Sequence, residues 1–486
     1  MKKLLVVVLL LSFALVSFAG CACDEDAPPT PPDQVDGPSE VIENGPVDPP
    51  DEPEVLVGGR IHEARDFGGR TIRVGAWWDE AIDTIAWGDE PDRATAVNYI
   101  VDRMVWDNAR RVEEAFNVNF EMVIVSYEDF LPTLTASVMA GEPFADIIML
   151  SGWMQMDSMG SIIQPWSNAN LPNSDVLGAQ IYAGPTTQND QGVWAIMPHS
   201  VEAEAFGLAV NLDIVNADGL PNPIDLFESG QWTWDAMLDL MRRATRDTTG
   251  SGTIDQFGIG GQPGDIIQHL IGANDGMMVD GDFNYGFDHP NTIRTLEFAQ
   301  QIFGERLWYV AADGFDTGNW NRNFYGPHET GNALLFPAVT WSLGNSPPPF
   351  NFGFVPFPTG PDNTTGSTWL TGIDQGICLA VGSEWDPADI LMIMEEIFSW
   401  SGDEPDLMFV AGQIDWMREH FRTEDDVQRA IHSGITAASD IGRSVSQYYW
   451  VLGSFAEAFW NQEMDVLQAV EYHRGPQQEM LDMRFR

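Results

Sequence analysis

The sequence has almost no lysine and few cations of any kind. Lys2 and Lys3 are the only lysines among 486 residues, and 23 Lys and Arg stand against 73 Asp and Glu, which gives a formal net charge of −50. Proteins that bind nucleic acid or anionic lipid through charge need clustered Lys and Arg, so the composition excludes that class of partner. Hydrophobic residues make up 44% of the chain, enough for a globular body, and the length indicates two or more lobes.

Positive charge is also unevenly distributed. No Lys or Arg occurs from Val112 to Met241, a stretch that holds 18 carboxylates. A binding site built from this stretch would disfavour phosphates and carboxylate anions, because like charges repel. Such a site would suit a neutral polyol or a cation.

Cysteines and catalytic motifs are scarce as well. Cys21, Cys23 and Cys378 are the only cysteines. If Cys21 is lipidated, the remaining Cys23 and Cys378 lie far apart in the sequence, so we expect neither a structural disulfide nor a metal site built from them. The chain contains no His-Glu-x-x-His, no Gly-x-Ser-x-Gly and no P-loop. We therefore name no catalytic residue, no metal ligand and no cofactor.

The one long apolar run is at the N-terminus. Lys2 and Lys3 precede the uncharged stretch Leu4 to Ala19, which is short for a membrane span and predicts a signal peptide over residues 1–20. The following Ser-Phe-Ala-Gly-Cys resembles a bacterial lipobox, which makes Cys21 the expected lipidation site. Phe18 stands where that motif usually has leucine, and ordinary cleavage after Ala19 remains the alternative.

Residues 21–56 form the next predicted segment. Ala22 to Leu56 holds nine prolines, eleven acids and no basic residue, so it cannot bury a core and will stay extended. At ~3.1 Å per residue this tether could reach roughly 100 Å from a membrane.

Strands and helices alternate after the tether. The apolar patterns predict strands at 71–77, 119–125 and 146–150 and helices at 97–116 and 127–140. This alternation predicts a parallel sheet covered by helices, in which ligands bind at the carboxyl ends of the strands. The aromatic residues that follow these strands are Trp77, Trp78 and Trp153.

Several segments of the chain resemble a known family. They are Arg-Arg-Val-Glu-Glu-Ala-Phe-Asn-Val-Asn-Phe-Glu, Ala-Gly-Glu-Pro-Phe-Ala-Asp-Ile-Ile, residues 201–223, Trp-Thr-Trp-Asp at 232–235 with Thr233 as the expected N-cap, and residues 332–358. Together they resemble the extracellular solute-binding proteins of family 1, the sugar-type receptors of ABC importers that include maltose-binding protein. The resemblance covers most of the chain from Arg70 to about Trp400.

The resemblance implies a fold and a division of the chain. The fold class is α/β, periplasmic-binding-protein-like II, with two α/β lobes, a ligand cleft between them and hinge crossovers. Lobe 1 would comprise residues 57–203 plus about 367–442, and lobe 2 residues 204–366 plus about 443–486. Such proteins do no chemistry on the ligand, and closure is a hinge motion that the ligand favours by contacting both lobes.

Aromatic residues are the first class of ligand-binding candidates, because sugars stack a C–H face on an aromatic ring. For any one of the 18 tryptophans, core packing is about as good an explanation, so position decides. By the resemblance, Trp341 matches a sugar-stacking aromatic of relatives and Trp153 a position that carries cleft residues. Trp77 and Trp78 end the first strand, and we choose Trp450 from an aromatic run in the tail helices.

Polar candidates are fewer. Glu204 aligns with a sugar-contacting acid of relatives at the first crossing between lobes, with Glu202 as the second choice. His199 lies just before that crossing and Asp374 in the return crossing. Ordinary loop or hinge structure is the alternative for both of these residues.

The segment from Asp247 to Asp255 resembles a calcium loop of some relatives. Two of the expected acids are replaced by hydroxyl residues, and Gly258 stands where a bidentate glutamate would be needed. We therefore predict an Asx- and glycine-rich turn, with calcium binding as the open alternative.

These observations predict a monomeric lipoprotein on the extracellular face of a bacterial cell membrane. It would bind a carbohydrate, with an oligosaccharide favoured, and deliver it to the transmembrane subunits of an ABC permease. The alternatives are a receptor for a cationic or zwitterionic solute and a secreted glycan-degrading enzyme.

The absence of lysine suggests a further hypothesis. Lysine loses its charge near its pKa of about 10.4, whereas arginine keeps it. We therefore hypothesise that the exported protein works in alkaline, saline surroundings, with biased codon use as the alternative.

Overall fold

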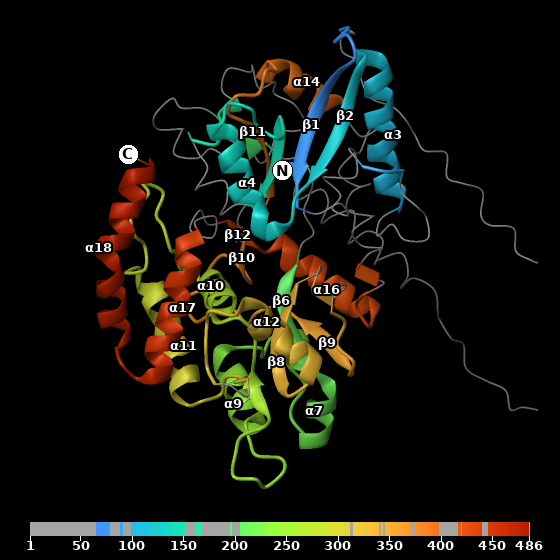
Figure 1. Ribbon diagram of the computed structural model, residues 1–486. Helices are drawn as coiled ribbons and strands as arrows, with labels where there is room; N and C mark the ends of the chain where they lie inside the picture. Colours follow the sequence, from blue (N-terminus) through green and yellow to red (C-terminus); the bar gives the residue numbers. More distant parts are fainter. Residues whose placement is uncertain are drawn as a thin grey trace, which may run out of the picture. The chain divides into compact units, whose positions relative to one another are not determined.

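The computed structural model describes residues 65–77, 88–90, 99–151, 161–166, 195–196, 205–311, 314–339, 342–343, 346–371, 375–397, 417–418, 420–439 and 446–485. The predicted signal peptide and tether, with Cys21, lie outside these residues. Two larger sheets with covering helices and one two-stranded sheet make up the described part of the chain, which confirms the α/β class (Figure 1).

The first sheet has the strand order β2-β1-β3-β11-β4, and β5 also pairs with β11. β1 is parallel to β2 and β3, as predicted, whereas β11 is antiparallel to β3, β4 and β5. The strands are β1 (Arg70–Ala76), β2 (Val118–Ile124), β3 (Ile147–Ser151), β4 (Ile163–Gln164), β5 (Ala195–Ile196) and β11 (Gln375–Ala380).

Helices cover both faces of this sheet, and β3 is therefore buried on each side. Ile147 and Met149 pack with α3 (Tyr99–Phe116) and α14 (Pro387–Ile397), while Ile148 and Leu150 point to the opposite face, toward α4 (Tyr127–Met139). Alternate side chains of a strand point to opposite faces, so one continuous apolar strand serves both layers. The helices α3 and α4 lie where the sequence predicted them.

The second sheet has the order β7-β8-β6-β9. β6 is antiparallel to β8 and β9, and β7 is parallel to β8. Every residue of these four strands is buried. They are β6 (Phe206–Asn211), β7 (Phe257–Ile259), β8 (Ala333–Val339) and β9 (Phe352–Val355).

The second sheet also has helices on two faces. Leu208 and Val210 of β6 share a core with α9 and α10, and Ala209 shares a core with α16. Thr233 caps α9 by accepting a hydrogen bond from the Ala236 N–H, as predicted. The helices of this region are α7 (Leu212–Asp218), α8 (Pro223–Glu228), α9 (Trp234–Ala244), α10 (Pro263–Gly272), α11 (Pro290–Gly304), α12 (Trp320–Thr330), α16 (Glu424–Ile435), α17 (Ser446–Asn461) and α18 (Val466–Phe485).

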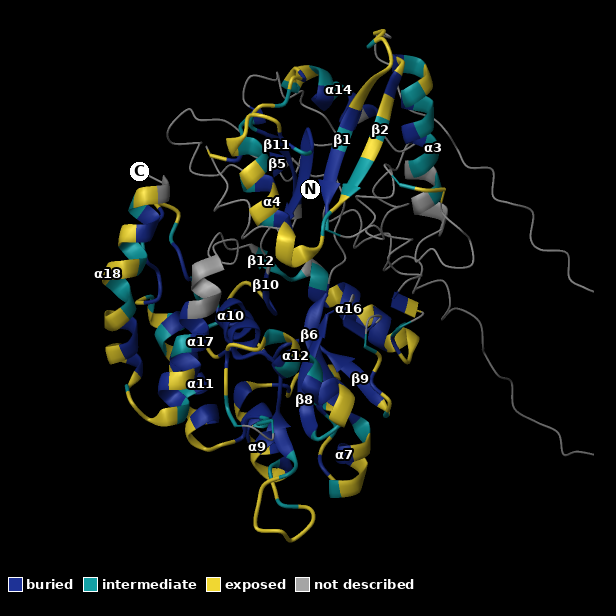
Figure 2. Cartoon of the chain, viewed as in Figure 1, coloured by how far each residue is buried: buried dark blue, intermediate teal, exposed yellow. Residues whose placement is uncertain are grey.

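All ten residues of α10 are buried, and Figure 2 shows this helix in uniform dark blue. α10 is therefore an interior helix, although it carries the polar residues Asp265, Gln268 and His269. α10 packs against α11, α17 and the two-residue strand β10 (Leu370–Thr371). A Cβ on Gly272 would lie 2.5 Å from the Leu370 Cγ atom, so only glycine allows this close approach.

One part of the predicted division differs from the structure. We placed about 367–442 in lobe 1, but among its described residues only β11 and α14 join the first sheet, whereas α16 packs on β6 and β9. The short strand β12 (Ala438–Ser439) pairs with β10, which packs on α10. The physical reason is that β9 is an edge strand whose backbone groups need partners.

Two side chains of α16 supply these partners to Phe354 of β9. Asp426 accepts a hydrogen bond from the Phe354 N–H at 2.8 Å, and the Arg429 Nε donates to the Phe354 carbonyl at 2.8 Å. Asp426 and Arg429 are joined to each other at 2.6 Å and are 1% and 8% exposed. The chain therefore passes from the first sheet to the second between α14 and α16.

Among the helices of the described residues, none is both long enough and apolar enough to cross a membrane.

We predict that Asp426→Ala lowers the free energy of unfolding by about 3–5 kcal/mol, because it leaves Arg429 as a buried charge without this carboxylate and the Phe354 N–H without its acceptor. Urea denaturation measures the change. Asp425→Ala is the matched control, since Asp425 is exposed in the same first turn of α16, and should cost less than about 1 kcal/mol. Equal effects of the two variants would contradict the structural role of Asp426.

We also predict a specific response to alkaline pH. Burial raises the pKa of Tyr285 above its ordinary value of about 10, and its hydroxyl donates to the Val470 carbonyl at 2.9 Å. Because the folded state holds this proton more tightly, its contribution is complete below pH 10 and is lost as the pH rises further. Burial also raises the pKa of the Cys378 thiol, which ionises at about pH 8.5 in an unfolded chain, and the described residues contain no lysine. The melting temperature should therefore be nearly constant from pH 7 to about 8, begin to fall as the unfolded thiol ionises, and fall more steeply above pH 10.

Tyr285→Phe should flatten the fall above pH 10, while losing about 1 kcal/mol at neutral pH with the hydrogen bond. Tyr472→Phe is the matched control, because Tyr472 is 66% exposed, and should leave the whole profile unchanged. A wild-type profile that already falls between pH 7 and 8, or a Tyr285→Phe profile that falls above pH 10 as steeply as the wild type, would refute the prediction.

Candidate functional site

The carboxyl ends of the parallel strands define one edge of the first sheet. β1, β2 and β3 end there, β5 runs in the same direction as β3, and β11 begins there, with Gln375 opposite Ser151. Open α/β sheets bind ligands at this edge. The predicted residues next to these strand ends in the sequence are Trp77 and Trp78 after β1, Trp153 after β3, His199 after β5 and Asp374 before β11.

Trp77 is the one member of this set that the structure describes. Its half-buried indole lies edge-on to Phe130, with ring centroids 5.2 Å apart, and to Tyr127, with ring centroids 5.9 Å apart. Phe130 is fully buried, so Trp77 packs on the core and is itself half-buried. Trp78, Trp153, His199 and Asp374 lie outside the described residues, and their roles stay predictions.

Sequence reasoning missed Tyr127 at the same edge. Tyr127 opens α4 just after β2 and is 53% exposed, and Ile124 at the end of β2 is 45% exposed. Ile124 pairs with Ala76 and so faces α3, whereas Trp77 and Tyr127 lie on the α4 face, where they form an accessible aromatic surface that we call the first-sheet shelf. The available signal was an aromatic residue between a strand end and a helix start, but Tyr127 was taken only as the start of a helix.

The corresponding edge of the second sheet is set by the pairing of Phe206 with Val339. β6 begins and β8 ends at this pair, and β7, parallel to β8, ends nearby at Ile259. Glu204 precedes β6 by two residues and Trp341 follows β8 by two residues in the sequence. Glu204, its second choice Glu202, and Trp341 lie outside the described residues. Trp450 lies in α17, but its side chain is not described.

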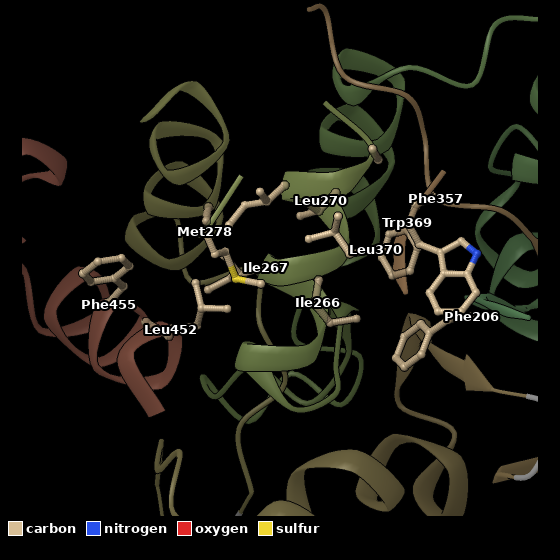
Figure 3. Close-up of a cluster of buried hydrophobic side chains, with 14 of the residues drawn as sticks. Phe206, Ile266, Ile267, Leu270, Met278, Phe357, Trp369, Leu370, Leu452 and Phe455 are labelled. Carbon is tan, nitrogen blue, oxygen red and sulfur yellow. The ribbon is translucent and has the colours of Figure 1, made fainter. Parts of the chain in front are cut away.

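A buried aromatic cluster fixes where β6 starts. The Phe206 and His269 ring centroids are 3.8 Å apart, and His269 lies edge-on to Trp369, at 5.4 Å. Trp369 in turn donates its indole N–H to the Ser433 carbonyl at 2.9 Å. Figure 3 shows Phe206, Phe357 and Trp369 gathered beside α10. The segments that lead to Glu204 and Asp374 therefore begin from one rigid cluster of the second sheet region.

The carboxyl end of β7 carries polar residues that sequence reasoning also missed. Gln262 is 1% exposed, donates to the Thr317 carbonyl at 2.9 Å and accepts from the Asn323 amide at 2.9 Å. Asp265, in the first turn of α10, accepts a hydrogen bond from the Trp320 indole N–H at 3.0 Å. The signal was the run Gly-Gly-Gln-Pro-Gly-Asp, in which glycine and proline follow a strand and open a helix.

The turn from Asp247 to Asp255 is closed by hydrogen bonds to backbone N–H groups. The Asp247 carboxylate accepts from Gly252 at 2.6 Å and from Gly250 at 2.8 Å, and these bonds, the Gly252 bond above all, lower its pKa. This is the Asx turn that the sequence predicts. Within the described ranges, no three His, Cys, Asp or Glu side chains are grouped as metal ligands.

Comparison with known proteins adds to this geometry. The family model of the bacterial extracellular solute-binding proteins matches residues 87–383, more than half of the chain. No curated protein matches the chain.

Solved structures share the fold. An ABC substrate-binding protein from Listeria monocytogenes in complex with cycloalternan is 12% identical, with a TM-score of 0.56, and covers 85% of this chain and 99% of its own. A maltose/maltodextrin-binding domain from Bdellovibrio bacteriovorus bound to maltotriose is 12% identical, with a TM-score of 0.52 over 85% and 100%. A Mycobacterium tuberculosis protein in complex with glycerophosphocholine is 15% identical, with a TM-score of 0.53 over 86% and 99%.

The family match over residues 87–383, together with two α/β sheets whose strand ends carry the aromatic residues, shows that the chain belongs to the bacterial extracellular solute-binding protein family.

Proposed function

We propose that this protein is the receptor of an ABC importer and that its ligand is a neutral carbohydrate. The observation that carries the proposal is the first-sheet shelf, in which Trp77 and Tyr127 present aromatic surface at the carboxyl ends of β1 and β2. A pyranose offers flat C–H faces that pack on such rings, and its hydroxyls need acceptors of the kind that carboxylates supply. The fold is shared with receptors that hold cycloalternan and maltotriose.

Charge supports a neutral ligand over an anion. Glu128 and Asp129 follow Tyr127 directly, and both are exposed. Carboxylates beside the shelf repel phosphate and carboxylate groups and accept hydrogen bonds from hydroxyls. We place Trp78, Trp153, His199, Glu204, Trp341, Asp374 and Trp450 in the same site as further contacts.

A cationic or zwitterionic solute is the second candidate. The same carboxylates would attract a cation, aromatic rings bind quaternary ammonium groups, and one structural neighbour holds glycerophosphocholine. The lack of Lys and Arg between Val112 and Met241 weighs against the phosphate of such a ligand. A thermal-shift screen with sugars, polyamines and betaines separates the two candidates.

We further propose the cellular arrangement: cleavage before Cys21, lipidation of its thiol, and a monomer that the acidic tether holds at the outer face of the membrane for delivery to the permease. Lobe closure without reaction on the ligand is part of the proposal. Release of reducing ends from polysaccharide by the purified protein would instead indicate a glycan-degrading enzyme.

Isothermal titration with mono- and oligosaccharides tests the ligand. We predict that Trp77→Ala weakens the binding of the best saccharide about tenfold or more, since it removes a stacking surface from the shelf. The matched control is Trp106→Ala on α3, because Trp106 is also half-buried but lies between Arg103 and Arg110, on a helix that covers a face of the sheet. No saccharide binding by the wild type, or equal loss in both variants, would overturn the proposal.

A further inference from the structure

A second aromatic surface lies at the edge of the second sheet. α12 begins at Trp320 and runs back to the start of β8, so its first turn lies near the end of β8. The hydrogen bond from Trp320 to Asp265 ties this turn to the carboxyl end of β7. Trp320 therefore lies at the edge that Glu204 and Trp341 adjoin in the sequence.

The indole of Trp320 is held on two sides. One face stacks on the fully buried Phe324, with ring centroids 4.5 Å apart and an angle of 13° between the rings. Its N–H is taken by Asp265, which is itself 9% exposed. These contacts fix the ring in one orientation, while Trp320 remains only half-buried.

Neighbouring polar groups hold the first turns of α10 and α12, which support the Trp320 indole. Asn323, 8% exposed, bonds to the buried Gln262 beside α10 and to the Asp316 carbonyl at 2.6 Å. A buried network in which each amide has partners holds its members rigidly. The first turns of α10 and α12 therefore form one unit beneath the indole.

We propose that Trp320 is a stacking platform for a second ring of the ligand, which makes this edge a site for an oligosaccharide and not for a monosaccharide. The inference rests on the proposed carbohydrate function. A ring that serves packing alone would gain most by full burial, whereas a rigid, half-buried ring with its N–H already satisfied loses little conformational entropy when a sugar covers it. Asp265 is a positioning residue, because it acts through the orientation of Trp320.

The test measures the affinities of a monosaccharide, a disaccharide and a trisaccharide of one series by isothermal titration. Trp320→Ala should weaken trisaccharide binding about tenfold or more and leave monosaccharide binding within about twofold, so the ratio of the two affinities falls. Trp320→Phe keeps a ring and should restore most of this ratio. A purely structural role would lower all the affinities together or none of them.

The matched control is Trp460→Ala. Trp460 is also half-buried and stacked on a phenylalanine, Phe315, at 4.5 Å and 11°, but it lies at the end of α17 beside Arg306. This variant should lose a comparable amount of stability and keep the trisaccharide-to-monosaccharide ratio. An unchanged ratio in Trp320→Ala, with binding intact in the wild type, refutes the platform alone, whereas absence of saccharide binding in the wild type refutes the carbohydrate proposal and the platform with it.

Discussion

Burial of α10 is the interaction on which the second sheet region depends. Figure 3 shows Ile266, Ile267 and Leu270 of this helix between Leu452 and Phe455 of α17 on one side and Phe206, Trp369 and Leu370 on the other. Removing apolar surface from water contributes about 25 cal/mol per Å², and a helix buried on all sides collects this contribution from every direction. Phe206 starts β6 and Trp369 directly precedes β10. Because both pack beside α10, the packing of this helix sets the position of both strands.

The two sheets share one arrangement of buried strands and accessible strand ends. Each buries its central strands on both faces, so side chains of these strands can reach a ligand only where the strands end. At the first sheet the ends carry Trp77 and Tyr127, and at the second they carry Asp265 and Trp320. Aromatic rings at these ends rest on buried phenylalanines, Phe130 and Phe324, which makes them rigid as well as accessible.

Local structure could be predicted from the sequence, but which elements pack against each other could be predicted less well. The alternation of strands and helices from 71 to 151 and the N-cap Thr233 were predictable, because period and capping are local properties. α16 was placed in the wrong neighbourhood from the sequence, since an amphipathic helix shows which face is buried but not against which sheet. Tyr127 and Trp320 were missed because a tryptophan or tyrosine at a helix start has the same sequence whether it packs inward or meets a ligand. Most predicted site residues adjoin the described strand ends without being described themselves.

The contact between α16 and β9 has a consequence for the tendency of the protein to aggregate. An open strand edge invites pairing with a strand of another molecule, which is a common route to aggregation. Here the N–H and carbonyl of Phe354 are already taken by Asp426 and Arg429. A helix that follows the first sheet in the sequence thus covers the edge strand of the second sheet, and a strand of a neighbouring molecule cannot pair with Phe354.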